Sequence, residues 1–244
     1  LENCLRSVVL DGTPARHGVA WAPRLQLFEQ ANGRADRKRP VLYVHGATFP
    51  SECSVFFRFD DGSWADALNK AGFAVWGLDF AGYGRSEGYP AIADVPEANE
   101  PLGRAGQAVG QVERAVRTIL AETGAQTISI IAHSWGTIAA CLFGGTHPDL
   151  VDRLILFGPI ARRETINSLP KIEPWRLLTI EAQKARFLED VPASEPAVLE
   201  ERDFIRWAET YIGFDAMGRM RNPPSVRIPS GPQAVSYTHL RAHE

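Results

Sequence analysis

A serine in this sequence stands where a strand pattern changes directly into a helix pattern. Ser134 lies in the pentapeptide AHSWG (132–136), which follows the β-branched run 127–131 and precedes a helix-like run of small residues. The small residues two positions before and after the serine, Ala132 and Gly136, allow a tight strand-to-helix turn that lifts the hydroxyl above the edge of a sheet. The pattern predicts a nucleophilic serine; the alternative is a buried serine at the ordinary end of a strand.

A second segment supplies main-chain N–H groups to the same region. The apolar strand pattern of residues 41–44 ends in the tetrapeptide HGAT (45–48). Because the carboxyl ends of parallel strands meet at one edge of a sheet, we expect the N–H groups of Ala47 and Trp135 to lie near Ser134. Such donors stabilise the negative charge of a tetrahedral acyl intermediate by about 3 to 4 kcal/mol each. Ala47 and Trp135 are therefore the predicted oxyanion-hole donors.

Strand-like and helix-like segments alternate along the first two thirds of the chain, which predicts an α/β fold with a doubly wound, mostly parallel sheet. The helix predicted near its middle carries apolar residues at helical spacing, and Gly124 is placed to end it. All four strands are continuous apolar runs, so each is expected to be buried. The predicted strands are 41–44, 73–78, 127–131 and 154–157. The predicted helices are 63–71, 103–123 and a short helix from the serine turn to about residue 147.

The pattern changes after residue 160. We assign residues 1–160 to the core, 161–222 to an inserted cap made of helices alone, and 223–235 to a truncated return toward the core. The tail 236–244 resembles translated sequencing-adapter read-through and is excluded from the functional reasoning. The cap carries an apolar face that is expected to pack against the core rather than to contact substrate, formed by Phe204, Trp207, Ala208, Tyr211 and Ile212.

Composition and charge disfavour several classes of protein. The 244 residues carry a net charge of -3, with 26 Lys and Arg mixed among 29 Asp and Glu, so no basic field for nucleic acid is expected. No apolar run approaches the roughly 18 to 20 residues of a membrane span. Three cysteines without metal-ligand spacing fit a reducing compartment, so a cytoplasmic protein is predicted. Oligomeric state is not indicated.

Three stretches of the sequence together resemble the signatures of the α/β-hydrolase superfamily. They are HG (45–46), DFAGYGRS (79–86) and AHSWG (132–136), in the order and spacing of that superfamily, and the resemblance covers about residues 5–160. Asp79, at the end of a predicted strand, is expected to hydrogen-bond the main chain of the nearby loop. The superfamily includes esterases, lipases, thioesterases, carbon-carbon bond hydrolases, peptidases and haloperoxidases, so the resemblance does not specify a substrate.

The resemblance implies roles for particular residues. Ser134 is the implied nucleophile, the N–H groups of Ala47 and Trp135 are the oxyanion donors, and neither a cofactor nor a metal is implied. His45 is expected to brace the oxyanion loop, the segment 45–48 that carries the Ala47 N–H, and neither His45 nor His133 is expected to act as the base. A serine at this position argues against epoxide and haloalkane hydrolysis, because those relatives use an aspartate there.

The acid and histidine of a catalytic triad follow the cap in that superfamily. We expect the sequence to stop before both, with the C-terminal strands of the sheet missing, so that the chain as given is inactive. Ser134, Asp215 and His239 form an alternative triad in the correct order. It is disfavoured because Asp215 has a helical context and His239 belongs to the tail.

These patterns predict a serine hydrolase that cleaves an ester or related acyl bond of a small apolar substrate through an acyl-enzyme. Four phenylalanines in the segment 49–59 favour an apolar acyl or alcohol group, although the same rings could only seal the core. The alternative from a different class is a non-catalytic α/β-hydrolase scaffold that binds a small ligand or a partner.

Overall fold

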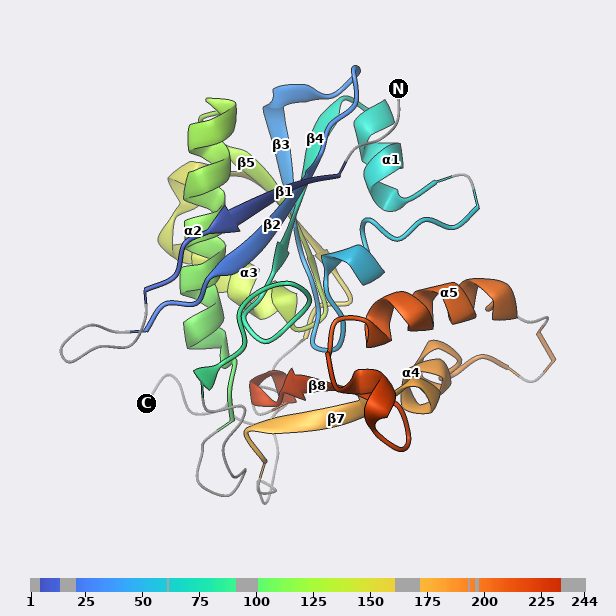
Figure 1. Ribbon diagram of the computed structural model, residues 1–244. Helices are drawn as coiled ribbons and strands as arrows, with labels where there is room; N and C mark the ends of the chain where they lie inside the picture. The colour runs from blue at the N-terminus through green and yellow to red at the C-terminus, as the bar shows by residue number, and fades with distance from the viewer. Residues whose placement is uncertain are drawn as a thin grey trace.

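Six strands form one mixed sheet at the centre of the molecule (Figure 1). The computed structural model describes residues 5–13, 21–60, 62–90, 101–160, 172–192, 194–195 and 198–233. The strand order is β1-β2-β4-β3-β5-β6, in which β1 and β2 are antiparallel to their neighbours and the other four strands are parallel. The strands are β1 (Leu5–Leu10), β2 (Leu25–Gln30), β3 (Asp36–Val44), β4 (Phe73–Asp79), β5 (Ile128–His133) and β6 (Val151–Phe157).

Helices cover both faces of the sheet. The helix α1 (Trp64–Lys70) lies on one face, and α2 (Ala105–Thr123) and α3 (Gly136–Thr146) lie on the other (Figure 1). A capping box between Ser63 and Asp66 starts α1, and Gly124, in the left-handed region, ends α2. The predicted α/β class with a doubly wound, mostly parallel sheet is confirmed. None of the helices in the described ranges combines the length and the apolar character needed to cross a membrane.

The strand β6 differs from its prediction. A buried strand was expected over 154–157, but Ile155, Leu156 and Phe157 are 44%, 39% and 53% exposed. The reason is topological, since β6 lies at the edge of the sheet and pairs only with β5 among the described residues. A run of apolar residues predicts a strand, but burial depends on which neighbours cover it.

A second unit, defined here as residues 172–233, lies beyond the carboxyl ends of the parallel strands (Figure 1). It contains α4 (Ile180–Phe187), α5 (Glu201–Ile212) and an antiparallel pair, β7 (Trp175–Thr179) and β8 (Ser225–Pro229). The expectation of helices alone between 161 and 222 is therefore wrong at β7. The predicted return toward the core is also revised, because β8 pairs with β7 rather than with the central sheet. Residues 161–171 lie outside the described ranges.

The apolar face of α5 packs on the core as predicted. Trp207 is 4% exposed and its Nε1 donates to the carbonyl oxygen of Cys53 at 2.9 Å. Tyr211 is 1% exposed and its hydroxyl donates to the carbonyl oxygen of Thr48 at 3.1 Å. These bonds fix the second unit to the segment that follows β3, which includes the short 3₁₀ helix η1 (Ser51–Cys53).

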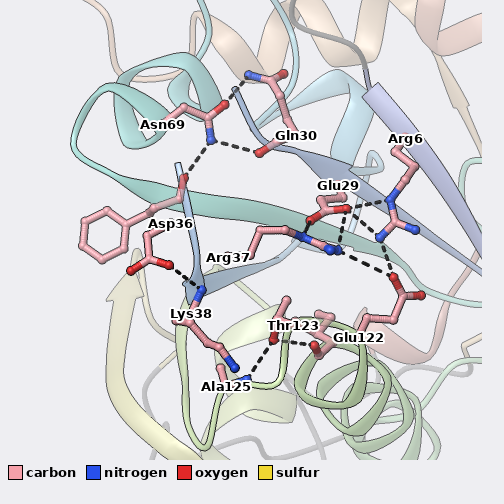
Figure 2. Close-up of polar contacts among 12 residues, drawn as sticks. Arg6, Glu29, Gln30, Asp36, Arg37, Lys38, Asn69, Glu122, Thr123 and Ala125 are labelled. Atoms are coloured by element: carbon pink, nitrogen blue, oxygen red, sulfur yellow. Dashed lines mark hydrogen bonds and ion pairs between the residues drawn. The ribbon is translucent and has the colours of Figure 1, made fainter. Parts of the chain in front are cut away.

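A network of charges joins the strands at the opposite end of the sheet. The buried carboxylate of Glu29 on β2 accepts from Arg6 of β1 at 2.6 Å and from Arg37 of β3 at 2.9 Å (Figure 2). Arg6 also reaches Glu122 of α2 at 2.5 Å. This network lies near the amino end of β3, whereas Ser134 lies at the other end of the sheet, after the carboxyl end of β5.

Candidate active site

Ser134 occupies the turn between β5 and α3. Its φ of 50° lies in the left-handed region, which is rare for a residue other than glycine. Its N–H donates to the carbonyl oxygen of Phe157 at 2.9 Å, and its own carbonyl oxygen accepts from the N–H of Thr137 at 3.0 Å. The predicted strand, tight turn and helix are present, and the half-buried serine stands at their junction.

Glycine at two positions lets this turn pack against the loop after β3. A Cβ on Gly136 would lie 2.4 Å from the carbonyl oxygen of His45 and 2.8 Å from that of Val44. A Cβ on Gly46 would lie 3.2 Å from the Cβ of Ser134. The loop and the serine are therefore in direct contact, as the meeting of two strand ends predicted.

His45 holds the loop from inside the core. Its buried ring accepts the N–H of Phe80 on Nε2 at 3.1 Å, so Nδ1 carries the hydrogen and donates to the carbonyl oxygen of Gly46 at 2.7 Å. Burial lowers the pKa of His45 to about 4, so the ring is neutral at pH 7. The prediction that His45 braces this loop is confirmed by these two bonds, and both nitrogens are already engaged.

The burial of His45 makes folding sensitive to acid. The folded pKa of about 4 lies below the ordinary 6.5, so the stabilisation is fully present above pH 6.5 and is lost as the pH falls toward 4. The expected loss from this group is about 3 kcal/mol of unfolding free energy. Urea unfolding of the protein and of the His45→Gln variant, at steps from pH 7.5 to pH 4, measures it as the difference between two curves.

The difference between the two curves isolates His45, because Asp79 changes the unfolding free energy with pH in both proteins. The effect of Asp79 is opposite in sign to that of His45. Burial raises the pKa of Asp79 to about 7, which favours the folded state at low pH. Parallel pH curves for the two proteins would show that the ring of His45 is not the group that titrates.

Side chains hold three carbonyl groups of the loop after β3. Because a carbonyl and the next N–H belong to one planar peptide, these bonds also fix the direction of the N–H groups. Besides the bond from His45 to Gly46, the hydroxyl of Tyr83 donates to the carbonyl oxygen of Ala47 at 2.9 Å. Tyr211 holds the carbonyl of Thr48 in the same way. The peptide that carries the Ala47 N–H is thus fixed on its carbonyl side. Sequence reasoning missed both tyrosines, although Tyr83 lies inside the DFAGYGRS stretch and Tyr211 on the apolar face of α5.

The two predicted donors keep their hydrogens available. Neither the N–H of Ala47 nor that of Trp135 donates to any residue in the described ranges. Unpaired N–H groups in protein interiors are uncommon and call for an explanation. Here both belong to segments that contact Ser134, which is the arrangement an oxyanion would need.

Asp79 has a structural environment. One carboxylate oxygen accepts the N–H of Ser51 at 2.9 Å and the other accepts the N–H of Arg85 at 3.2 Å. A Cβ on Gly84 would lie 2.0 Å from the carboxylate, so this glycine packs directly against it. The expectation that Asp79 bonds loop main chain is confirmed.

An apolar cavity of about 310 Å³ opens beside the serine turn, between the core and the second unit. His133, the neighbour of Ser134, contributes to its wall and packs on Phe157 with ring centroids 5.2 Å apart. Of the four phenylalanines in the segment 49–59, Phe56 packs in the core, and three line the cavity. Those three are Phe49, Phe57 and Phe59.

The alternative triad loses its acid. Asp215 accepts from Arg221 at 2.7 Å and from the N–H groups of Met217 and Arg227, each at 2.9 Å. Burial alone would raise the pKa of Asp215, but Arg221 and these N–H groups outweigh it and hold the pKa below its usual value. Asp215 therefore stabilises the turn between α5 and β8. The other member, His239, lies outside the described residues.

Comparison with known proteins identifies the fold. A family model described as alpha/beta hydrolase fold matches residues 39–209. The chain belongs to this family. A search of curated proteins found no match to this α/β hydrolase.

Solved structures of similar fold carry several activities. A carboxylesterase of the thaumarchaeon Nitrososphaera gargenis is 14% identical with a TM-score of 0.54, over 90% of this chain and 69% of that one. An epoxide hydrolase mutant of Vigna radiata is 16% identical with a TM-score of 0.52, over 96% and 76%. The thioesterase domain from the curacin biosynthetic pathway is 16% identical with a TM-score of 0.51, over 85% of this chain. The chain spans 66% of that thioesterase domain, just under two thirds.

Proposed function

We propose that this α/β hydrolase is a serine hydrolase that cleaves an ester or related acyl bond of a small apolar substrate. The observation that carries the proposal is the left-handed turn at Ser134, set against a loop whose Ala47 N–H has no partner among the described residues. A non-glycine residue in that conformation is strained, and such strain is concentrated at functional sites. A serine at this position favours acyl chemistry over the epoxide chemistry named for one structural neighbour.

The proposed reaction has two steps. The Oγ of Ser134 attacks the acyl carbonyl and loses its proton to a base, and the N–H groups of Ala47 and Trp135 stabilise the resulting oxyanion. Collapse expels the alcohol and leaves an acyl-enzyme, which water then hydrolyses to release the acid and restore the serine. The family resemblance assigns the base and its acid partner to residues that follow the cap.

The histidines of the described ranges do not supply that base. Both nitrogens of His45 are engaged inside the core, and His133 packs on Phe157 in the wall of the apolar cavity. His147 stacks on Phe143 with ring centroids 5.0 Å apart, at the far end of α3.

The apolar cavity supports the proposed substrate class. Its wall of aromatic rings adjoins His133, so an apolar acyl or alcohol group could occupy it while the scissile carbonyl lies at Ser134. Exposed rings of Trp64 and Phe157, with centroids 5.7 Å apart, stand at this wall.

A fluorophosphonate probe tests the proposal on the full natural protein. We expect one covalent adduct, mapped by peptide mass spectrometry to Ser134, because among the serines of the described ranges only Ser134 combines the left-handed turn with neighbouring N–H groups that have no described partner. Ser134→Ala should abolish labelling. An adduct on another serine, or undiminished labelling of the alanine variant, would remove the nucleophile assignment. Absence of any adduct would favour the non-catalytic scaffold.

A further inference from the structure

A partly buried arginine, Arg176 of β7, faces the core from the second unit and has no acidic partner among the residues that the structure describes. Arg176 and Leu178 alternate along β7 and so share one face of the strand, and Leu178 packs against the core. Ile228, the residue paired with Arg176 on β8, is 1% exposed. The Nε atom of Arg176 is buried and has no hydrogen-bond partner in the described part of the chain, and no carboxylate there forms an ion pair with it.

A buried amide lies on α4, the helix that follows β7. Gln183 of α4 is fully buried and lies beside the hydroxyl of Tyr211, but neither of its amide atoms reaches hydrogen-bonding geometry with a described residue. Burial of an unpaired amide or guanidinium opposes folding. The Nε of Arg176 and the amide of Gln183 both carry this cost, and a ligand that paired with them would remove it.

Their position connects them to the oxyanion loop. Arg176 lies close enough to Tyr83 and Tyr211 to interact with both electrostatically, and these are the tyrosines whose hydroxyls hold the carbonyls of Ala47 and Thr48. The apolar cavity adjoins the same loop through Phe49. The oxyanion loop thus has an apolar neighbour in the cavity and a polar neighbour in Arg176.

Arg186, the charged neighbour that affects the pKa of Arg176, is also positive. Burial lowers the pKa of Arg176, and repulsion from Arg186 on α4 lowers it further. Arg186 is exposed and acts similarly on His133. Among the described residues, neither arginine has a carboxylate within ion-pair distance, so an anion brought by a ligand would relieve this repulsion.

We propose that Arg176 and Gln183 bind a carboxylate of the substrate, so that the acyl compound cleaved at Ser134 carries an acid group as well as an apolar group. One guanidinium matches the single charge of a carboxylate, whereas a phosphate dianion would bring a second charge with only the exposed Arg186 near. Guanidinium and carboxylate pair through two parallel hydrogen bonds, and an amide donates a third. This inference deepens the proposed function and rests on it.

Binding of matched esters tests the proposal without turnover. The probes are the monoethyl esters of succinic, glutaric and adipic acid, each compared with its diethyl ester by calorimetry on the full natural protein carrying Ser134→Ala. We expect at least one monoester to bind about tenfold or more tightly than its diester. Arg176→Met should remove that preference, and Arg153→Met, at an arginine whose side chain is 76% exposed on β6, should keep it.

The melting temperature of Arg176→Met is a second readout. It should rise if Arg176 is kept for ligand binding and fall if Arg176 stabilises the fold. Replacing a partly buried arginine, whose Nε has no partner in the described part of the chain, by an apolar side chain of similar length should raise the melting temperature, so Arg176→Met gains stability while it loses the preference. Gln183→Leu should behave likewise. A lower melting temperature or loss of folding in Arg176→Met would show that the arginine is structural and would overturn the assignment.

Each of the remaining outcomes also has a defined consequence. No monoester preference, including no detectable binding of any probe, overturns the inference, as does a preference that persists in Arg176→Met. Inorganic phosphate that displaces the monoester at lower concentration than acetate would make the ligand a phosphate and contradict the carboxylate. Binding does not need the Ser134 hydroxyl, so the two proposals can fail separately. A monoester preference without fluorophosphonate labelling would reject only the proposal that Ser134 is a nucleophile. Labelling without a monoester preference would reject only the carboxylate site at Arg176 and Gln183.

Discussion

Replacing Ser134 by alanine lowers kcat for ester hydrolysis by the full natural protein by about 10⁴ to 10⁶, if Ser134 is the nucleophile. The effect falls on kcat because the hydroxyl forms the bond that changes in the reaction, whereas the groups that bind the ester remain in place. The fold should tolerate the change, since the Oγ atom makes no hydrogen bond to any described residue. Initial rates over a range of p-nitrophenyl butyrate concentrations, with thermal melts of both proteins, measure the two effects separately.

Ser129 provides the matched control for that substitution. It lies on β5, the strand that leads into the Ser134 turn, and its hydroxyl donates to Asp152 of β6 at 3.2 Å, away from the loop after β3. Ser129→Ala should leave kcat within about twofold and lower stability by about 1 kcal/mol through the lost hydrogen bond. If the two alanine variants lost activity equally, or if Ser134→Ala retained turnover, the nucleophile would have to be sought elsewhere.

The parts of the site that the sequence predicted are those determined by local patterns. The turn at Ser134 follows from the small residues Ala132 and Gly136 between a strand and a helix, so periodicity and residue size are sufficient to find it. The role of His45 is implied by the resemblance of the HG stretch to the superfamily signature, and not by periodicity.

Features that depend on distant pairing were missed. Trp175–Thr179 is a five-residue run whose pattern does not distinguish a strand from a helix, and it becomes a strand because β8, far along the chain, pairs with it. Exposure of β6 has the same origin, since it reflects the absence of a described neighbour at that edge. Tyr211 and Thr48 are 163 residues apart, so no local signal could pair the α5 hydroxyl with the loop carbonyl.

Arg176 shows a further limit of sequence reasoning. An arginine between a tryptophan and a leucine is ordinary as a sequence. Only the packing of β7 onto the core shows that its guanidinium is partly buried and has no acidic partner in the described ranges. Conflicts of this kind between a residue and its surroundings are expected at functional positions, because a stability optimum would remove them.

Replacing Gly136 by valine should unfold the serine turn or destabilise the protein by more than about 3 kcal/mol. The first added atom already fails to fit, because a Cβ there would lie 2.4 Å from the carbonyl oxygen of His45. The carbonyl oxygens of His45 and of Val44, which a Cβ would meet, are backbone atoms at the end of β3 and in the loop after it, so they cannot move aside without displacing the Ala47 N–H. Urea unfolding measures the loss, and fluorophosphonate labelling reports whether the turn survives.

Two companion variants separate this clash from a general effect of substitution. Gly145 lies on the same helix, and a Cβ there would meet nothing within 4 Å, so Gly145→Val should be nearly neutral. Ala132→Gly removes one methyl group and should cost only about 1 kcal/mol, because it creates space without a collision. An unchanged melting temperature and full labelling of Gly136→Val would show that the serine turn does not pack against the loop after β3. The proposal that Ala47 and Trp135 donate to one oxyanion would then have to be abandoned.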